Sequence, residues 1–108
     1  EGAHTDLAAA ALSAGRYDRA EAAATVLIGM NPRAVEPLLT RSAARAASGD
    51  WPGSLADANA ALAIHPLHPR ARLRLAVALH RTGDPSAGAA EAATAAALAT
   101  SDRQRDAL

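Results

Sequence analysis

Runs of about 12 mostly apolar, helix-forming residues fill the chain, and short polar breaks that contain glycine or proline separate them. Each run predicts an α-helix, because it is built from helix formers and ends at a residue that stops helices. The predicted helices cover residues 3–14, 18–30, 35–48, 52–64, 70–82 and 85–99. Ser101 and Gln104 fit a capping box that opens another helix at 102–108. The shortness of the breaks makes neighbouring helices antiparallel.

The breaks recur with a fixed period. Gly15, Gly49 and Gly83 are each 34 residues apart, and so are Pro32 and Pro66. Each glycine can adopt a positive φ and close the preceding helix as the residue after its C-cap. Each proline follows Asn or His in a step that ends the second helix of a unit. The period therefore predicts a series of helical hairpins.

With this period, the residues at matching positions resemble the tetratricopeptide repeat (TPR) family. Repeat position 8 is small in every unit, position 17 is aromatic in two units, and position 24 is alanine where the family usually has an aromatic residue. These residues are Ala8, Ser42 and Ala76; Tyr17, Trp51 and Pro85; and Ala24, Ala58 and Ala92. The third unit departs most from the family, since it lacks both the aromatic residue and the proline.

The resemblance implies an all-α fold, namely a superhelical array of antiparallel helix-turn-helix hairpins. It divides a single domain, residues 1–102, into repeats at 1–34, 35–68 and 69–102, and residues 103–108 begin a capping or further helix. Tyr17 and Trp51 are expected to pack between the two helices of their repeats, with stacking on a ligand as the alternative.

Composition supports the helical prediction and makes the core shallow. The chain has 33 alanines but no Phe, one Tyr and one Trp. Alanine is the best helix former, whereas the β-branched and aromatic residues that strands favour are scarce. Because few side chains are large, close approach of the helices has to replace bulky anchors.

The charge balance and the absence of cysteine exclude several functions. Eleven arginines balance 11 acidic residues, whereas non-specific nucleic-acid binding needs a basic surplus. Without cysteine there is no disulfide or thiolate zinc site, which fits the cytoplasm and the bacterial periplasm equally. No apolar run is long enough to span a membrane. The lysine-free, Ala- and Arg-rich usage suggests a bacterial source, and a chain that begins with Glu1 leaves open a leader or further domains upstream.

No motif predicts catalysis. The glycines are isolated, no His-Glu-x-x-His pair occurs, and no serine lies in a nucleophile elbow. His65 and His68 could share a metal in their turn, but each precedes a proline that favours extended backbone, so solvated loop histidines are the preferred interpretation. We expect no enzyme, no cofactor and no metal.

The resemblance places the first helix of each repeat on a concave face that holds a partner. The candidate partner-binding residues are Thr5, Ala9, Leu12, Leu39, Thr40, Ala43, Ala47, Arg70, Leu73, Arg74, Val77 and Arg81. Leu39, Ala43, Leu73 and Val77 would form an exposed apolar strip. Arg70 and Arg74 lie one helical turn apart and would meet an acidic group of the partner, the alternative being a solvated face with weak salt bridges.

Two hypotheses follow for function. The first is a protein-interaction module that binds a peptide or partner protein in assembly of a bacterial complex. The second is a structural or regulatory appendage of a larger enzyme or transcription regulator. Some relatives clamp the carboxylate of chaperone tails with five residues, but only Arg70 and Arg74 match that clamp, so this ligand is not expected. Residues 101–108 are too short for a good cap, which predicts self-association through the C-terminal end or a longer array.

Overall fold

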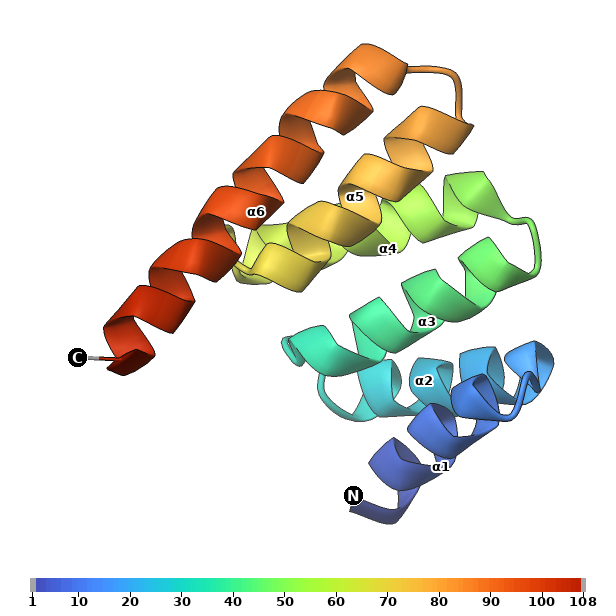
Figure 1. Ribbon diagram of the computed structural model, residues 1–108. Helices are drawn as coiled ribbons and strands as arrows, with labels where there is room; N and C mark the ends of the chain where they lie inside the picture. Colours follow the sequence, from blue (N-terminus) through green and yellow to red (C-terminus); the bar gives the residue numbers. More distant parts are fainter. Residues whose placement is uncertain (1, 108) are drawn as a thin grey trace.

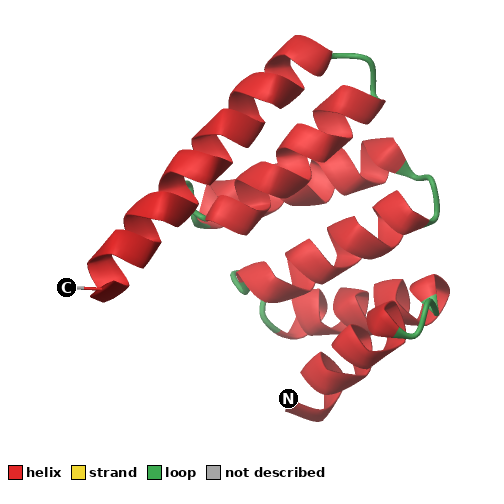
Figure 2. Ribbon diagram, viewed as in Figure 1, coloured by secondary structure: helices red, strands yellow, loops and turns green. Residues whose placement is uncertain are grey.

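The computed structural model describes the backbone of residues 2–107 and the side chains of residues 7–101. In the described range the chain forms six helices and no strand (Figure 1). They are α1 (Gly2–Ser13), α2 (Tyr17–Met30), α3 (Val35–Ala47), α4 (Trp51–Ile64), α5 (Pro69–Arg81) and α6 (Pro85–Ala107). Short loops connect them (Figure 2). The all-α prediction is confirmed, and the first five helices begin and end within one residue of the predicted bounds.

The helices stack as antiparallel hairpins in a curved array. Each helix packs against its neighbours along the chain, and α1 also contacts α3, which contacts α5. Figure 1 shows α1 at one end of the array and α6 at the other. The three odd-numbered helices therefore form one continuous face. No helix in the described part of the chain is both long and apolar enough to cross a membrane.

Glycine closes the first helix of every hairpin, as the sequence predicts. Gly15, Gly49 and Gly83 have φ values of 76°, 86° and 100°, a region that L side chains disfavour. At the second turn the Gly49 N–H donates to the carbonyl of residue 46 at 3.0 Å, and the N–H of residue 50 donates to that of residue 45 at 2.8 Å. These two bonds form a Schellman motif, which satisfies carbonyls at the end of α3.

The second helix of a hairpin ends at proline in the first two repeats but not in the third. Helices α2 and α4 end at Met30 and Ile64, before Asn-Pro and His-Pro. Helix α6 instead continues to Ala107, so the predicted break at 99 and the capping box at Ser101 are wrong. Thr100 stands where the other repeats have proline, and its hydroxyl donates to the Ala96 carbonyl at 3.0 Å within an unbroken helix.

Small residues make the helix contacts. The fully buried alanines are Ala20, Ala24, Ala44, Ala58, Ala61, Ala71 and Ala78. Between α3 and α4, the hydroxyls of Ser42 and Ser54 lie 2.9 Å apart, and Ser42 also donates to the Ser54 carbonyl. At the matching place between α5 and α6, a Cβ on Gly88 would lie 2.8 Å from the Ala76 carbonyl oxygen. Close backbone approach therefore replaces bulky packing, as the composition indicates.

The two aromatic residues do not pack alike. Tyr17 is exposed, so the expectation that it fills the space between α1 and α2 is wrong. Trp51 is half-buried, and the guanidinium carbon of Arg81 lies 5.2 Å from its ring centroid. This cation–π contact joins α4 to the end of α5, and so links the second and third repeats.

Candidate partner-binding groove

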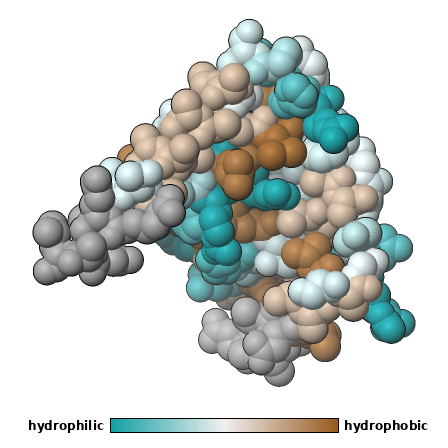
Figure 3. Space-filling view, viewed as in Figure 1, coloured by the Kyte–Doolittle hydropathy of each residue, from teal (hydrophilic) through white to brown (hydrophobic). Residues whose placement is uncertain are grey.

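A groove of about 250 Å³ runs across the face formed by α1, α3 and α5. Seven of the predicted partner-binding residues line it together with Glu36. They are Leu12, Leu39, Thr40, Ala43, Arg70, Leu73 and Arg74. Figure 3, viewed from the same side as Figure 1, shows apolar and polar surface alternating over these helices. The stacking of first helices thus brings together residues that lie a full repeat apart in sequence.

The floor of the groove is apolar, but its leucines differ in exposure. Leu39 is only 6% exposed and belongs to the core cluster with Leu38, Ala61 and Ala71. The expected exposed strip is therefore wrong at this position, and Leu39 forms the base of the groove. Leu73 is 46% exposed, which makes it the apolar side chain most open to a ligand.

Charged side chains line the edge of the groove. Arg70 donates to the carboxylate of Glu36, and both side chains are largely exposed. Arg74 is half-buried, and it has no salt-bridge partner within the described side chains. Glu36 thus neutralises much of the charge of Arg70, and Arg74 is the better placed of the two to bind a carboxylate.

The remaining predicted residues lie outside this groove. Val77 and Arg81 line a cavity of about 360 Å³ between α5 and α6. Ala9 is exposed on α1 and Ala47 at the end of α3, and neither lines these two cavities. The side chain of Thr5 lies outside the described residues.

Sequence reasoning missed a charged cluster between α2, α3 and α4. The Asp57 carboxylate accepts hydrogen bonds from Arg41, the shortest 2.9 Å, and from Arg45 at 3.2 Å. Arg45 also donates to Glu21 at 3.0 Å, and Arg41 donates to the Thr25 hydroxyl at 3.2 Å. The sequence did contain a signal for this cluster: two arginines stand one helical turn apart, and an acidic residue follows inside the next predicted helix.

The cluster holds Arg45 firmly in its charged form. Burial lowers the pKa of Arg45, but the hydrogen bond to Glu21 and the charges of Asp57, Glu21 and Asp50 together raise it above its ordinary value. Because these groups come from three helices, the cluster ties the first repeat to the second.

The two histidines of the turn before α5 have a structural role. His68 is the N-cap of α5, and its Nδ1 accepts from the N–H of Ala71 at 3.4 Å. The His65 and His68 rings meet edge to face with centroids 5.2 Å apart. His68 therefore caps a helix instead of being merely solvated. Within the described side chains, no group of three His, Cys, Asp or Glu residues could hold a metal ion.

Taken together, the stacked antiparallel hairpins define a TPR-like all-α superhelix. Two solved structures with this TPR-like fold are similar. MamA MSR-1 C2 matches with a TM-score of 0.82 and 16% identity, over 92% of this chain and 57% of that chain. The type III secretion translocator chaperone SycD of Yersinia enterocolitica, in an alternative dimer, matches with a TM-score of 0.85 and 18% identity, over 90% and 74%. No protein-family model and no curated protein match the sequence.

Proposed function

We propose that this chain is a protein-interaction module that binds a peptide, or a segment of a partner protein, in the groove across α1, α3 and α5. The observation that carries the proposal is the groove itself, in which leucine side chains form the floor and arginine stands at the edge. Repeats 1–34, 35–68 and 69–102 are its proposed units, because each supplies one of the three helices that line the groove.

The groove favours a ligand that carries one apolar side chain beside an acidic group. Leu73 offers exposed apolar surface on which such a side chain can be buried. The acidic group would bind Arg74 directly, whereas binding at Arg70 requires it to displace Glu36. The ion pair between Arg70 and Glu36 therefore disfavours ligands that carry no negative charge beside Arg70.

The similar structures support a binding role of this kind. SycD is a translocator chaperone of type III secretion, and this chain covers about three quarters of its length. Because the face of α1, α3 and α5 offers a groove that can hold a ligand, we propose binding without turnover in the assembly of a bacterial complex.

Displayed peptide selection followed by titration tests the proposal. Peptides selected from a random library would be titrated against the wild type, Arg74→Gln and Leu73→Asp. We expect selected peptides to be acidic, and each variant to weaken binding by roughly tenfold, the scale of one desolvated contact. Ala90→Gln, on the exposed surface of α6, is the matched control and should bind like the wild type. Peptides that bind all four proteins equally would refute the groove as the site.

The cavity between α5 and α6 supports a second, smaller proposal, that copies associate through the C-terminal end. Val77 and Ala92 line this cavity, and Ala92 is exposed. Sedimentation velocity should show a concentration-dependent dimer that Ala92→Gln weakens. A monomer at all concentrations would refute this association.

A further inference from the structure

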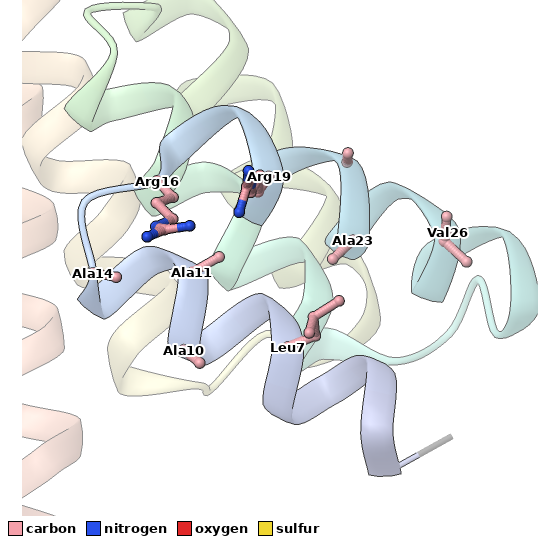
Figure 4. A pocket seen from close by; sticks show the side chains of 9 residues that line it. Leu7, Ala10, Ala11, Ala14, Arg16, Arg19, Ala23 and Val26 are labelled. Carbon is pink, nitrogen blue, oxygen red and sulfur yellow. The ribbon is translucent and has the colours of Figure 1, made fainter.

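A second groove, of about 620 Å³, lies between α1 and α2 at the N-terminal end of the array. Figure 4 shows Leu7 and Val26 at one end of it and Arg16 and Arg19 near the α1–α2 loop, with Ala10 and Ala11 along α1. Its walls are mostly methyl groups, and its two polar side chains are both cationic. It is separate from the groove proposed above, with which it shares no lining residue.

The internal repeat shows what covers such a groove elsewhere in the chain. Leu7 is 63% exposed, whereas Leu75, two repeats later, is 7% exposed. Ala10 is exposed, whereas its counterparts Ala44 and Ala78 are fully buried. In the later repeats the preceding second helix packs there, since α2 contacts α3 and α4 contacts α5. The exposed face of α1 therefore has the shape that accepts an antiparallel helix.

The charges show which helix would fit. In the second repeat, Arg45 at repeat position 11 binds Glu21 of the covering helix at 3.0 Å. The first repeat has Ala11 at that position and places arginine at position 19, where the second repeat has Gly53. A Cβ on Gly53 would lie 3.0 Å from Cδ of Arg45. The side chain of Arg19 therefore leaves the backbone close to the position that a carboxylate equivalent to Glu21 would occupy on a docked helix.

Arg16 adds a second cation at the same end. The charge of its counterpart Asp50 helps to raise the pKa of Arg45, so the two side chains are near each other. Arg16 therefore also lies near the expected carboxylate. Within the described side chains neither Arg16 nor Arg19 forms a salt bridge. The groove thus has apolar walls and a positive end, which is complementary to a helix with the opposite arrangement.

We propose that this N-terminal groove docks an acidic amphipathic α-helix of a partner protein, antiparallel to α1. The helix would carry a carboxylate in its first turns and small or aliphatic residues three and seven positions later. Helix α2 shows this pattern on α3, because Glu21 pairs with Arg45, Ala24 is fully buried and Ile28 packs on the core cluster. Spacings of three and seven place all three side chains on one helix face.

A second copy of this chain fits the groove less well. Its α6 would present the counterparts of Glu21, Ala24 and Ile28, and these are all alanines: Ala89, Ala92 and Ala96. That face offers neither a carboxylate for the arginines nor an aliphatic side chain for the groove. Charge complementarity therefore favours the acidic partner helix over self-association at this end.

A blocked, fluorescein-labelled peptide of residues 17–30, the sequence of α2, is the probe. Titration with the whole protein should raise the anisotropy to saturation, and amide shifts should concentrate on α1 and α2. The peptide variant Glu21→Gln should bind roughly fivefold more weakly, the upper range for a part-exposed ion pair. Ala10→Gln in the protein should reduce binding at least as much, because it fills the groove with a helix-compatible side chain. Ala90→Gln is the matched control and should bind normally.

A charge swap separates docking from changes in folding. Arg19→Glu should weaken binding of the wild-type peptide, and the peptide variant Glu21→Arg should recover it. Equal binding of both peptides to wild type and Arg19→Glu would overturn the proposal. So would shifts confined to α5 and α6, or a concentration-dependent dimer, without peptide, that Ala10→Gln abolishes. Arg74→Gln should leave binding of this peptide unchanged, so failure of this inference and failure of the proposed function are distinguishable.

Discussion

The buried carboxylate of Asp57 allows a sharp test of how the first two repeats are held together. Its side chain is 3% exposed and accepts hydrogen bonds from Arg41 and Arg45, whose side chains are 17% and 23% exposed. Asp57→Ala removes the carboxylate and leaves two half-buried guanidinium groups without it. Thr25 still accepts from Arg41 and Glu21 still accepts from Arg45, so the loss of partners is partial.

The expected cost follows from these contacts. Breaking a buried ion pair costs about 3–5 kcal/mol because a charge stays behind without compensation. Both arginines keep some contact with water and one other partner each, which reduces the expected loss to about 2–3 kcal/mol. For a domain of this size that corresponds to a fall in Tm of about 10 °C. Urea and thermal unfolding, followed by circular dichroism, measure both quantities.

The third repeat supplies the control. It has Leu75 and Leu79 where the second repeat has Arg41 and Arg45. The triple variant Arg41→Leu, Arg45→Leu and Asp57→Ala should therefore recover at least half of the loss, since apolar side chains can replace a buried ion cluster without net cost. A loss below about 1 kcal/mol for Asp57→Ala, or a triple variant less stable than the single one, would refute the reasoning.

The pH dependence of this effect should be flat around neutrality. The pKa of Arg45 is raised in the folded protein, so its contribution is complete below the unfolded pKa and is lost only as pH rises through the folded value. Both values lie far above neutral pH. The titration of Arg45 should therefore not change the difference in unfolding free energy between wild type and Asp57→Ala when that difference is measured from about pH 7 to about pH 9.

Backbone geometry carries three further predictions. Gly49→Ala should lower the unfolding free energy, measured by urea titration, by about 1–2 kcal/mol because φ is +86°. The matched variant Gly29→Ala should raise it by about 0.5–1 kcal/mol, because Gly29 lies inside α2 with open space where a Cβ would stand. Gly88→Ala should cost about 1–3 kcal/mol, since its Cβ would overlap the Ala76 carbonyl; an unchanged Tm would contradict that contact. Thr100→Pro should end α6 early and reduce the ellipticity at 222 nm.

The local fold could be predicted because the signals are local. The residues Gly49 and Pro66 stop helices by their own backbone chemistry, so spacing alone located the turns. The helix end expected at residue 99, in the third repeat, is wrong. Ser101 has the composition of an N-cap, but no glycine or proline breaks the ladder of hydrogen bonds before it, and α6 continues through it.

The site was predictable as a face but not in its details. Repeat spacing assigns Leu39 with Leu73, and Thr40 with Arg74, to one groove, because equal positions in stacked helices lie side by side. Spacing also places Glu36 beside Arg70, because both stand at repeat position 2. Spacing does not tell that Leu39 is buried by its neighbours, since its burial depends on the distance between helices. The cluster around Asp57 was missed for the same reason: it needs three helices in register.

The alanine-rich helix contacts have a consequence for how this array tolerates substitution. A buried alanine has one methyl group to lose, so truncation removes little, whereas any larger side chain must push two helix axes apart. In a stacked array that displacement is passed on to every later repeat. An enlargement at Ala71, which packs with Leu38 and Leu39 of α3, would therefore alter the spacing of α3 and α5, and with it the width of the groove, without changing any residue that lines it.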